Sequence, residues 1–389
     1  MNENKSAYAS RGVSATKDEV HAAIKHQDKG VFPGAFCKLV ADPAGDDGYC
    51  AAFHADGAGT KSALAYIKYR ETGDVSAFYD IAQDSAVMNM DDLLCIGASK
   101  GFVMSNTIGR NAHRVPGEAI AAVIDGYAGF AEKMAEYGVD IIMAGGETAD
   151  VGDLVGTIIC DSTFFVRLAK ADVVDCDNIK PGDVIVGLAS FGQASYEDKY
   201  NAGMGSNGLT AARHLLLSHK YADKYPETYS ATMGKDNAYV GKYDAFDTLP
   251  GTDVAVIDAI LSPTRTYAPI VAEIFRQKVD VHGMIHCTGG GQAKCKNFGK
   301  NLHYIKDDLF DRPPLFEAFA ESGAIDEKEM YQVFNMGHRM ELYLSREDAE
   351  KVIEISRSFG VDAKIVGRVE ESDGKNKVTL TDRGNTFVY

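Results

Sequence analysis

The segment from about Ala119 to Ala144 limits the fold most strongly, because a helix-forming pattern is followed directly by a strand-forming one. Apolar side chains recur at helical spacing, as on one face of an amphipathic helix, at Ile120, Val123, Tyr127, Phe130, Met134 and Tyr137. Gly138 ends this pattern, and Val139 to Ala144 is a short apolar run typical of a strand. A chain built from such alternation is expected to adopt a mixed α and β fold.

The same alternation recurs along the chain. Strands are expected at Tyr49 to His54, Gly182 to Leu188 and Val279 to Cys287, and helices at Leu209 to Leu217 and Thr266 to Gln277. Residues 169–181, with the sequence AKADVVDCDNIKP, are charged and irregular. We therefore set the domain boundary there, with domains at 1–175 and 176–389. The tyrosine-rich stretch Lys220 to Tyr243 is interpreted as a surface insertion.

Composition restricts the class of protein. With 389 residues and 45% hydrophobic content, the chain can bury a core large enough for two domains. No stretch approaches the roughly 18 to 20 apolar residues of a membrane span. The polar start MNENKSAYASRG lacks the layout of a signal peptide, so a cytoplasmic location is expected.

Charge and cysteine content exclude further classes. A net charge of −16 disfavours binding to nucleic acid and to anionic membranes, so a phosphorylated substrate would need local help from metal ions, lysines or backbone amides. The seven cysteines are scattered and contain no Cys-x-x-Cys pair. They are therefore expected to be reduced thiols that mainly contribute to packing.

Three acidic motifs are candidates for a metal site. In Asp56-Gly57-Ala58-Gly59-Thr60-Lys61 the glycines let backbone amides approach an anion, the aspartate can hold a divalent cation, and the lysine can reach a phosphate. The motif lacks the Walker spacing, and an ordinary turn is the alternative.

The second motif runs from Asp84 to Gly97 and is expected to be helical, with Asp84 and Asp91 on one face and Asp92 one step round. Clustered carboxylates destabilise a helix unless a cation compensates, and the alternative is a solvated acidic face. The third motif, Gly145-Gly146-Glu147-Thr148, is expected where a strand ends in a loop. Together Asp56, Asp92 and Glu147 form an oxygen ligand set of the kind magnesium prefers.

The second half contains two candidate anion sites. Ser206 and Asn207 precede a helix, where the ordinary role is capping but where free amides also attract phosphate. The glycine-rich run Thr288-Gly289-Gly290-Gly291 follows a strand, and close backbone approach to a ligand is favoured over a simple loop. His282 and His286 share one side of that strand, and either a proton-transfer role or a packed histidine fits.

Taken in order, these motifs resemble the aminoimidazole ribonucleotide synthetase (phosphoribosylformylglycinamidine cyclo-ligase) family over nearly the whole chain. Leu261-Ser-Pro-Thr-Arg-Thr-Tyr267 and Val281-His-Gly-Met-Ile-His-Cys-Thr-Gly-Gly-Gly291 distinguish this family from the related selenophosphate synthetases. The resemblance implies a homodimer whose amino-terminal sheets form a barrel-like core, beside a carboxy-terminal substrate-binding α/β domain. ATP would bind in the cleft between them.

The resemblance also implies the chemistry and the roles of residues. ATP would activate the formyl oxygen of formylglycinamidine ribonucleotide, a ring-forming nitrogen would attack, and phosphate would leave with ADP. Asp56, Asp92 and Glu147 would hold Mg²⁺, and Lys25 and Lys61 would touch ATP phosphates. His286, Lys25 and Asp92 are the candidate catalytic residues, and the substrate phosphate would bind at 288–291. The wider nucleotide site would include Gly57, Gly59, Thr60, Asp84, Gly146, Thr148, Ser206 and Asn207.

The sequence departs from the family pattern at three places. Similar members carry Pro-His-Ser-Asn-Gly where this chain reads Met204-Gly205-Ser206-Asn207-Gly208, and the preceding loop Ser195 to Gly203 is lengthened. Their Phe-Asn-x-Gly-x-Gly-Met becomes Phe334-Asn-Met-Gly-His-Arg339-Met340, and Lys220 to Tyr243 lengthens the second domain. Either His286 or another group replaces the missing histidine, or activity is altered. A selenophosphate synthetase-like enzyme, suggested by Gly34 to Lys38, and a non-catalytic nucleotide-binding paralogue are the alternatives.

Overall fold

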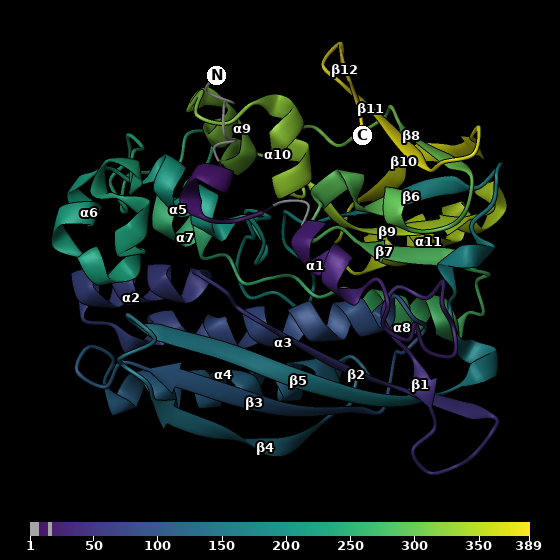
Figure 1. The fold of residues 1–389 in the computed structure, drawn as a ribbon, viewed down its shortest axis with the longest axis horizontal. Helices are drawn as coiled ribbons and strands as arrows, with labels where there is room; N and C mark the ends of the chain where they lie inside the picture. Colours follow the sequence, from purple (N-terminus) through teal and green to yellow (C-terminus); the bar gives the residue numbers. More distant parts are fainter. Residues whose placement is uncertain (1–7, 15–17) are drawn as a thin grey trace.

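The computed structural model describes residues 8–14 and 18–389, and Figure 1 shows its two sheets one above the other. The first sheet has five strands in the order β1-β2-β5-β3-β4. These strands are β1 (Val40–Ala41), β2 (Tyr49–Gly57), β3 (Phe102–Arg110), β4 (Ile141–Asp150) and β5 (Ile158–Ala169). All pairs are antiparallel except β3 with β4.

The second sheet has seven strands in the order β12-β11-β8-β10-β6-β9-β7. They are β6 (Val184–Ala189), β7 (Gly283–His286), β8 (Leu302–Lys306), β9 (His338–Leu344), β10 (Ala363–Glu371), β11 (Lys377–Asp382) and β12 (Asn385–Val388). The helices around this sheet are α5 (Leu209–Leu216), α6 (Lys220–Lys224), α7 (Val256–Ile260), α8 (Ala268–Arg276), α9 (Pro314–Glu321), α10 (Glu327–Val333) and α11 (Arg346–Ser358). The expected mixed α and β class, with two sheets and covering helices, is confirmed.

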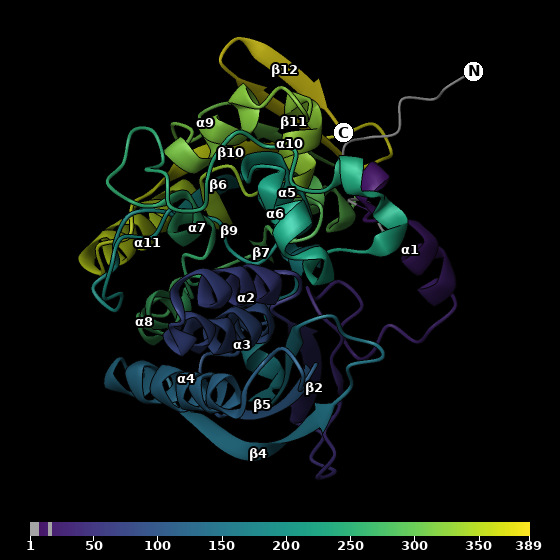
Figure 2. The same ribbon diagram turned by 90° about the vertical axis from the view of Figure 1, so that its left-hand side faces the viewer.

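Helices cover only one face of the first sheet. α2 (Lys61–Thr72), α3 (Tyr79–Leu94) and α4 (Gly117–Glu136) lie between this sheet and the second one, and the opposite face is bare (Figures 1 and 2). Phe53 and Ile142 remain 72% and 61% exposed. The short helix α1 (Asp18–Ile24) lies near the junction of the two halves.

Helix α3 is the centre of the molecule. It packs against β2 and β5 on one side and against α8 and β7 on the other. Asp84, Asp91 and Asp92 are consequently buried. A solvated acidic face, the alternative left open by the sequence, is therefore excluded for these three carboxylates.

Strand β4 differs from the sequence-based expectation. The glycine pair 145–146 was expected to end the strand, but β4 continues to Asp150, and the register shifts by one residue opposite Met104 to Asn106. A bulge absorbs the glycines instead of a loop, since Gly145 adopts a φ of +85° at no steric cost. Glu147 therefore lies within an exposed edge strand.

The 220–243 stretch is also different from expectation. Tyr221, Tyr225 and Tyr239 are buried, and Glu227 accepts a 2.6 Å hydrogen bond from the hydroxyl of Tyr66 on α2. The stretch is thus a packed element joining the two halves of the chain. All seven cysteines are free thiols, six of them buried. Within the described ranges, no helix has the length and apolar character needed to cross a bilayer.

Candidate functional site

A cavity of about 490 Å³ lies where β2 and α3 of the first half face the glycine-rich loop of the second. Among the residues predicted from the sequence, it gathers Asp56, Asp92, Asn207, Thr288, Gly289 and Gly290. Its other lining side chains include His54, Met88, Phe36, Phe298, Lys294 and Lys296. The cavity therefore has an acidic wall from the first half and a basic wall from the second.

Asp92 is the deepest charged group of the acidic wall. Its Oδ1 accepts a 2.7 Å hydrogen bond from Nδ1 of His286, and its Oδ2 lies 3.2 Å from Nε2 of His54. Burial would raise the pKa of Asp92, but these two histidines and the charge of Lys294 outweigh it and lower the pKa well below its usual range. Asp92 is therefore a fixed anion at the bottom of the cavity.

The two histidines have different environments. His54 lines the cavity, and its Nδ1 lies 2.9 Å from Oδ1 of Asn89. Burial alone would lower the pKa of His54, but Asp92, Asn89 and Asp56 raise it above the ordinary value. His286 is fully buried, and burial lowers its pKa to about 4 despite its hydrogen bond to Asp92. His286 is thus a neutral imidazole behind Asp92, outside the cavity lining.

The basic wall is built around Thr288. Nζ of Lys294 donates a 2.7 Å hydrogen bond to Oγ1 of Thr288 and lies 4.5 Å from the ring centre of Phe36. Phe36 in turn stacks on Phe298, with 5.2 Å between ring centres. Gly290 has a φ of +93°, so the loop turns sharply beside these groups. Such an arrangement of cation, hydroxyl and glycine backbone suits an anion.

Asp56 and Glu147 are separated in the single chain. Glu147 pairs with Thr107, which pairs with Asp161, which pairs with Gly57. Three strand spacings of about 4.8 Å put Glu147 about 14 Å from β2. Because side chains alternate between faces, Asp56 shares the helix-covered face with His54, whereas Glu147 lies on the bare face. The expected convergence of Asp56, Asp92 and Glu147 is therefore not formed within one chain.

A different carboxylate lies near Asp56. Burial, together with the negative charge of Asp56, raises the pKa of Asp161. Asp161 pairs with Gly57 and Thr107, however, so its side chain lies on the bare face with Glu147 and not in the cavity. The carboxylates that line the cavity are Asp56 and Asp92, and their oxygen atoms are donors of the kind that suit magnesium.

Lys61 has a position that the sequence did not predict. Its Nζ donates to Oδ1 of Asp84 at 2.6 Å and to the carbonyls of Ser262 at 2.6 Å and Gly205 at 3.3 Å. The ammonium group is completely buried and all three of its hydrogens have acceptors. Lys61 therefore joins α2 to two loops of the second half and does not face the cavity.

Asp84 completes this buried junction. Its Oδ1 also accepts hydrogen bonds from the amide of Thr264 at 2.8 Å and its hydroxyl at 2.5 Å. Oγ of Ser206 lies 2.8 Å from Oγ1 of Thr264. Asp84 and Ser206 thus support the cavity from behind rather than line it.

The remaining predicted residues lie away from the cavity lining. Lys25 follows α1 and is exposed. Oγ1 of Thr60 lies 3.0 Å from Oγ1 of Thr210. Gly57 is the last residue of β2, Gly59 lies in the turn before α2, Gly146 and Thr148 belong to β4, and Gly291 packs against the backbone near Tyr331.

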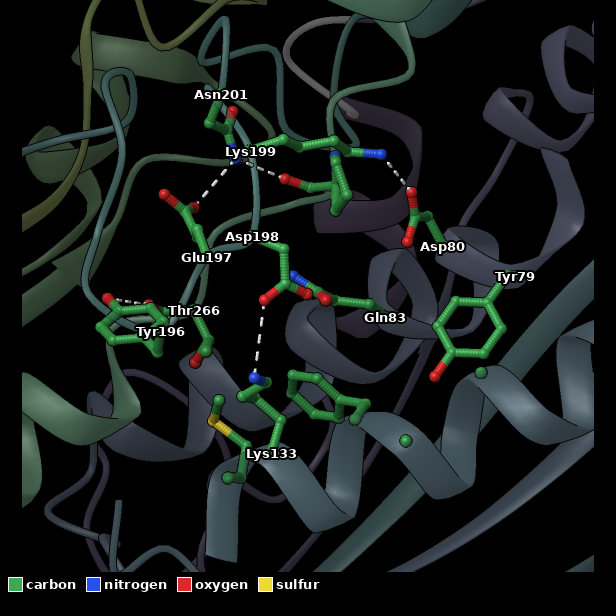
Figure 3. A pocket seen from close by; sticks show the side chains of 15 residues that line it. Tyr79, Asp80, Gln83, Lys133, Tyr196, Glu197, Asp198, Lys199, Asn201 and Thr266 are labelled. Atoms are coloured by element: carbon green, nitrogen blue, oxygen red, sulfur yellow. Dashed lines mark hydrogen bonds and ion pairs between the residues drawn. The ribbon is translucent and has the colours of Figure 1, made fainter. Parts of the chain in front are cut away.

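The lengthened loop before Gly205 borders a second, smaller pocket of about 190 Å³ (Figure 3). Lys199 pairs with Asp80 at 2.9 Å, and Asp198 pairs with Lys133 at 3.6 Å. Next to them Glu197 accepts a 2.9 Å hydrogen bond from Nε of the buried Arg265. The loop therefore ties the Pro-Thr-Arg motif to α3 and α4.

Two family models match this chain. They are the AIR synthase related protein N-terminal domain over residues 28–164 and the AIR synthase related protein C-terminal domain over residues 180–379. The chain belongs to the AIR synthase family. This confirms the resemblance inferred from the motifs.

Curated members of the AIR synthase family align along most of the chain. A phosphoribosylformylglycinamidine cyclo-ligase of Methanococcus vannielii is 30% identical over 369 residues, which cover 94% of this chain and 89% of that protein. One from Methanocaldococcus jannaschii is 30% identical over 320 residues, covering 82% and 77%. These relatives are similar to the chain in length as well as in sequence.

Solved structures of the wider AIR synthase fold also match. Thermotoga maritima PurL complexed with FGAR gives a TM-score of 0.56 at 19% identity and covers 96% of this chain. The chain spans about half of that protein, 49% of its length. A chain of a HypE–HypF complex gives a TM-score of 0.56 at 17% identity, covering 97% and 99%. At these identities the likeness shows the fold alone.

Sequence reasoning missed His54, Asn89 and Lys294. A usable signal existed for His54, because a period of two puts it on the same strand face as Asp56. No comparable signal existed for Lys294, whose position depends on how the chain folds back after the glycine-rich run.

Proposed function

We propose that this member of the AIR synthase family catalyses the ATP-dependent cyclisation of formylglycinamidine ribonucleotide to aminoimidazole ribonucleotide, as phosphoribosylformylglycinamidine cyclo-ligases do. Curated relatives that carry this name match the chain nearly end to end. The observation that carries the proposal is the cavity with Asp56 and Asp92 on one wall and Thr288, Gly289 and Lys294 on the other. It suits a reaction between two phosphorylated molecules. Such chemistry belongs in the cytoplasm, the location that we infer.

Nucleotide and metal are assigned to the acidic wall. Related folds have been solved with bound nucleotide, namely T. maritima PurL with AMPPCP and HypE with ATP. We infer that Asp56 and Asp92 hold Mg²⁺ in this protein. When bound, the ion neutralises charge on the nucleotide phosphates. Lys25 remains a candidate ATP contact, whereas the full set of acceptors around Lys61 supports a structural role for it.

The substrate phosphate is assigned to the basic wall. The backbone of the 288–291 loop, the hydroxyl of Thr288 and the ammonium of Lys294 supply donors of the kind a phosphate needs. Asn207 faces the same cavity from the opposite loop. This arrangement would hold the ribonucleotide with its reacting end toward Asp92 and His54.

The role proposed for His286 is to position Asp92. A catalytic acid or base must reach the substrate, and His286 is buried outside the cavity lining. Its hydrogen bond to Asp92 instead fixes the direction of that carboxylate, as groups behind a metal ligand commonly do. His54 is the imidazole that borders the cavity.

We further propose a homodimer with a barrel-like core formed by the first sheets of two copies. The uncovered face of that sheet supports this, because it exposes Phe53, Ile142 and Ile159. Soluble monomers rarely leave such a face open. Glu147 lies on the same face, so any contribution of Glu147 to a metal site would come from the partner chain. The division into domains 1–175 and 176–389 stays part of this proposal.

The selenophosphate synthetase-like alternative needs a reactive cysteine near Gly34 to Lys38. Burial and the charge of Asp92 raise the pKa of Cys37 well above its ordinary value, which disfavours the thiolate. This environment argues against that alternative.

The decisive experiment is a coupled assay with ATP, magnesium and formylglycinamidine ribonucleotide, scored for aminoimidazole ribonucleotide and ADP. Formation of both supports the proposal, and an Asp92→Asn variant is expected to lose it. A folded wild-type protein that binds AMPPCP without forming product would instead indicate a non-catalytic paralogue.

A further inference from the structure

Gly205 stands where similar family members carry a histidine, and its surroundings explain how the chain accommodates the difference. Gly205 has a φ of +70°. A Cβ at this position would lie 2.9 Å from Nη1 and 3.4 Å from Cδ of Arg339. Contacts below about 3 Å are closer than ordinary van der Waals contact allows. The side chain of Arg339 therefore fills the space into which a residue at position 205 would project.

Arg339 is itself a departure from the family pattern, since it replaces the second glycine of Gly-x-Gly. Its side chain is 3% exposed, and Nη2 donates a hydrogen bond to the carbonyl of Arg265. Nη2 also lies 3.7 Å from Oδ2 of Asp91, and the guanidinium carbon lies 5.5 Å from the ring centre of Tyr267. The buried positive charge is thus compensated by a buried carboxylate, a carbonyl and an aromatic ring.

The loop that Arg339 contacts leads directly to the cavity. Nδ2 of Asn335 donates to the carbonyls of Gly203 at 2.8 Å and Met204 at 3.2 Å, and Lys61 holds the carbonyl of Gly205. Two residues later, Asn207 lines the cavity. In the described part of the chain, the buried Oδ1 of Asn207 has no hydrogen-bond partner. An unpaired buried oxygen at a cavity wall is available to a ligand.

We propose that Arg339 and Gly205 are a coupled exchange in which Arg339 positions the 204–207 loop so that Asn207 contacts the substrate. This inference rests on the proposed function and identifies a positioning residue for it. Arg339 does not replace the missing histidine in proton transfer, because a guanidinium stays protonated and this one is buried. Arg339 instead fills the volume that the histidine side chain would occupy, and it anchors the loop.

A double-mutant cycle tests the exchange. Gly205→Ala in the wild-type background forces Arg339 away, so the KM for formylglycinamidine ribonucleotide should rise about 10-fold or more, with a smaller change in kcat. Arg339→Ala removes the conflict, so adding Gly205→Ala to that variant should change KM by less than about 3-fold. Equal effects of Gly205→Ala in both backgrounds would overturn the proposal.

Backbone strain at position 205 is common to both backgrounds and cancels in the cycle. Gly73→Ala is the matched control, because Gly73 has a φ of +75° with no atom within 4 Å of a Cβ. It should leave KM unchanged. If Arg339→Ala does not fold, Arg339→Lys serves in the cycle, since it keeps the charge beside Asp91 but is shorter and loses the planar fork.

A second readout separates this proposal from the proposed function. Urea unfolding and AMPPCP affinity are measured on the same four proteins. If the wild type forms no aminoimidazole ribonucleotide, the cyclo-ligase assignment fails, and the cycle is then evaluated from AMPPCP affinity. Coupling between positions 205 and 339 in both unfolding and affinity supports the positioning role. Coupling in the unfolding free energy alone would mean that the two residues only pack together, and it would overturn the proposed positioning role.

Discussion

His286 holds Asp92 from behind the cavity, with 2.7 Å between Nδ1 of the histidine and Oδ1 of the carboxylate. The other carboxylate oxygen faces His54 at 3.2 Å. Asp92 is therefore held by a histidine on each side, and the same carboxylate lines the cavity. The buried neutral imidazole of His286 and the cavity-lining imidazole of His54 together orient the carboxylate of Asp92 for binding.

Replacing His286 should impair catalysis through Asp92. His286→Ala is expected to lower kcat by about 10²-fold and to raise the magnesium concentration needed for half-maximal activity, because residues behind a metal ligand commonly contribute 10- to 100-fold. His286→Asn can retain a donor toward Asp92 and should recover part of the loss. Steady-state kinetics over a magnesium series checks this. Full activity in a folded His286→Ala protein would show that the clamp is dispensable.

Lys61 should matter for stability rather than for ATP binding. Lys61→Met leaves the charge of Asp84 buried without its partner, which should lower the free energy of unfolding by about 3–5 kcal/mol. Lys68→Met on the same helix is the control, because Lys68 pairs with Asp258 at 2.8 Å in a partly exposed position and such pairs contribute about 0–1 kcal/mol. Urea unfolding measures both. An increase in the KM for ATP without loss of stability would favour the phosphate contact predicted from sequence.

Lys294 is expected to bind the phosphate of the ribonucleotide substrate. Lys294→Ala should raise the KM for formylglycinamidine ribonucleotide by about 10-fold or more, the value of one charge-assisted contact, with little change in the KM for ATP. Lys300→Ala is the matched control, since Lys300 pairs with Asp177 and does not line the cavity. Kinetics with each substrate varied in turn checks this, and a selective effect on ATP would reverse the assignment of the two walls.

The bare sheet face predicts a dimer that a single charge can weaken. Phe53→Asp puts a carboxylate on the exposed apolar face, so the dimer dissociation constant should rise by about 10²-fold, the effect of losing a large aromatic interface anchor. Leu154→Asp is the control, because Leu154 is 86% exposed in the connection between β4 and β5. Sedimentation velocity at micromolar concentration measures both, and a monomeric wild type would contradict the proposed barrel.

The sequence predicted local structure well because the decisive signals were local. The periodicity at 119–137 matched α4, and the acidic stretch at 84–92 matched α3. The glycine pair at 145–146 misled because a bulge and a strand end share the same glycine signal, and only pairing with β3 distinguishes them.

The site could be predicted only in part, because its contacts join distant segments. Asp56, Asp92 and Thr288 were found from motifs and share the cavity. The partners of Asp92 come from β2 and β7, and no sequence pattern pairs His54 with His286. For Lys61 the sequence and the structure indicate different roles, because a lysine after a glycine-rich turn is typical of phosphate sites, whereas here the second half packs directly on the start of α2.

His214 is expected to make the folded protein sensitive to acid. It is fully buried on α5, its Nδ1 accepts a 3.1 Å hydrogen bond from the amide of Tyr239, and its ring packs edge-on to that tyrosine. Burial, with the nearby charges of Arg213 and Arg11, lowers its pKa to about 2. In the unfolded chain a histidine titrates near pH 6.5, so between about pH 6.5 and 2 the unfolded state binds the additional proton. The contribution of His214 to stability is therefore complete above about pH 6.5 and is lost as the pH falls below it, by about 2 kcal/mol between pH 7 and pH 5.

Urea unfolding at these two pH values should show a smaller acid-induced loss of stability in His214→Asn than in the wild type. The variant His113→Asn, at an exposed histidine, should behave like the wild type. An unchanged acid-induced loss in His214→Asn would mean that other groups cause the sensitivity.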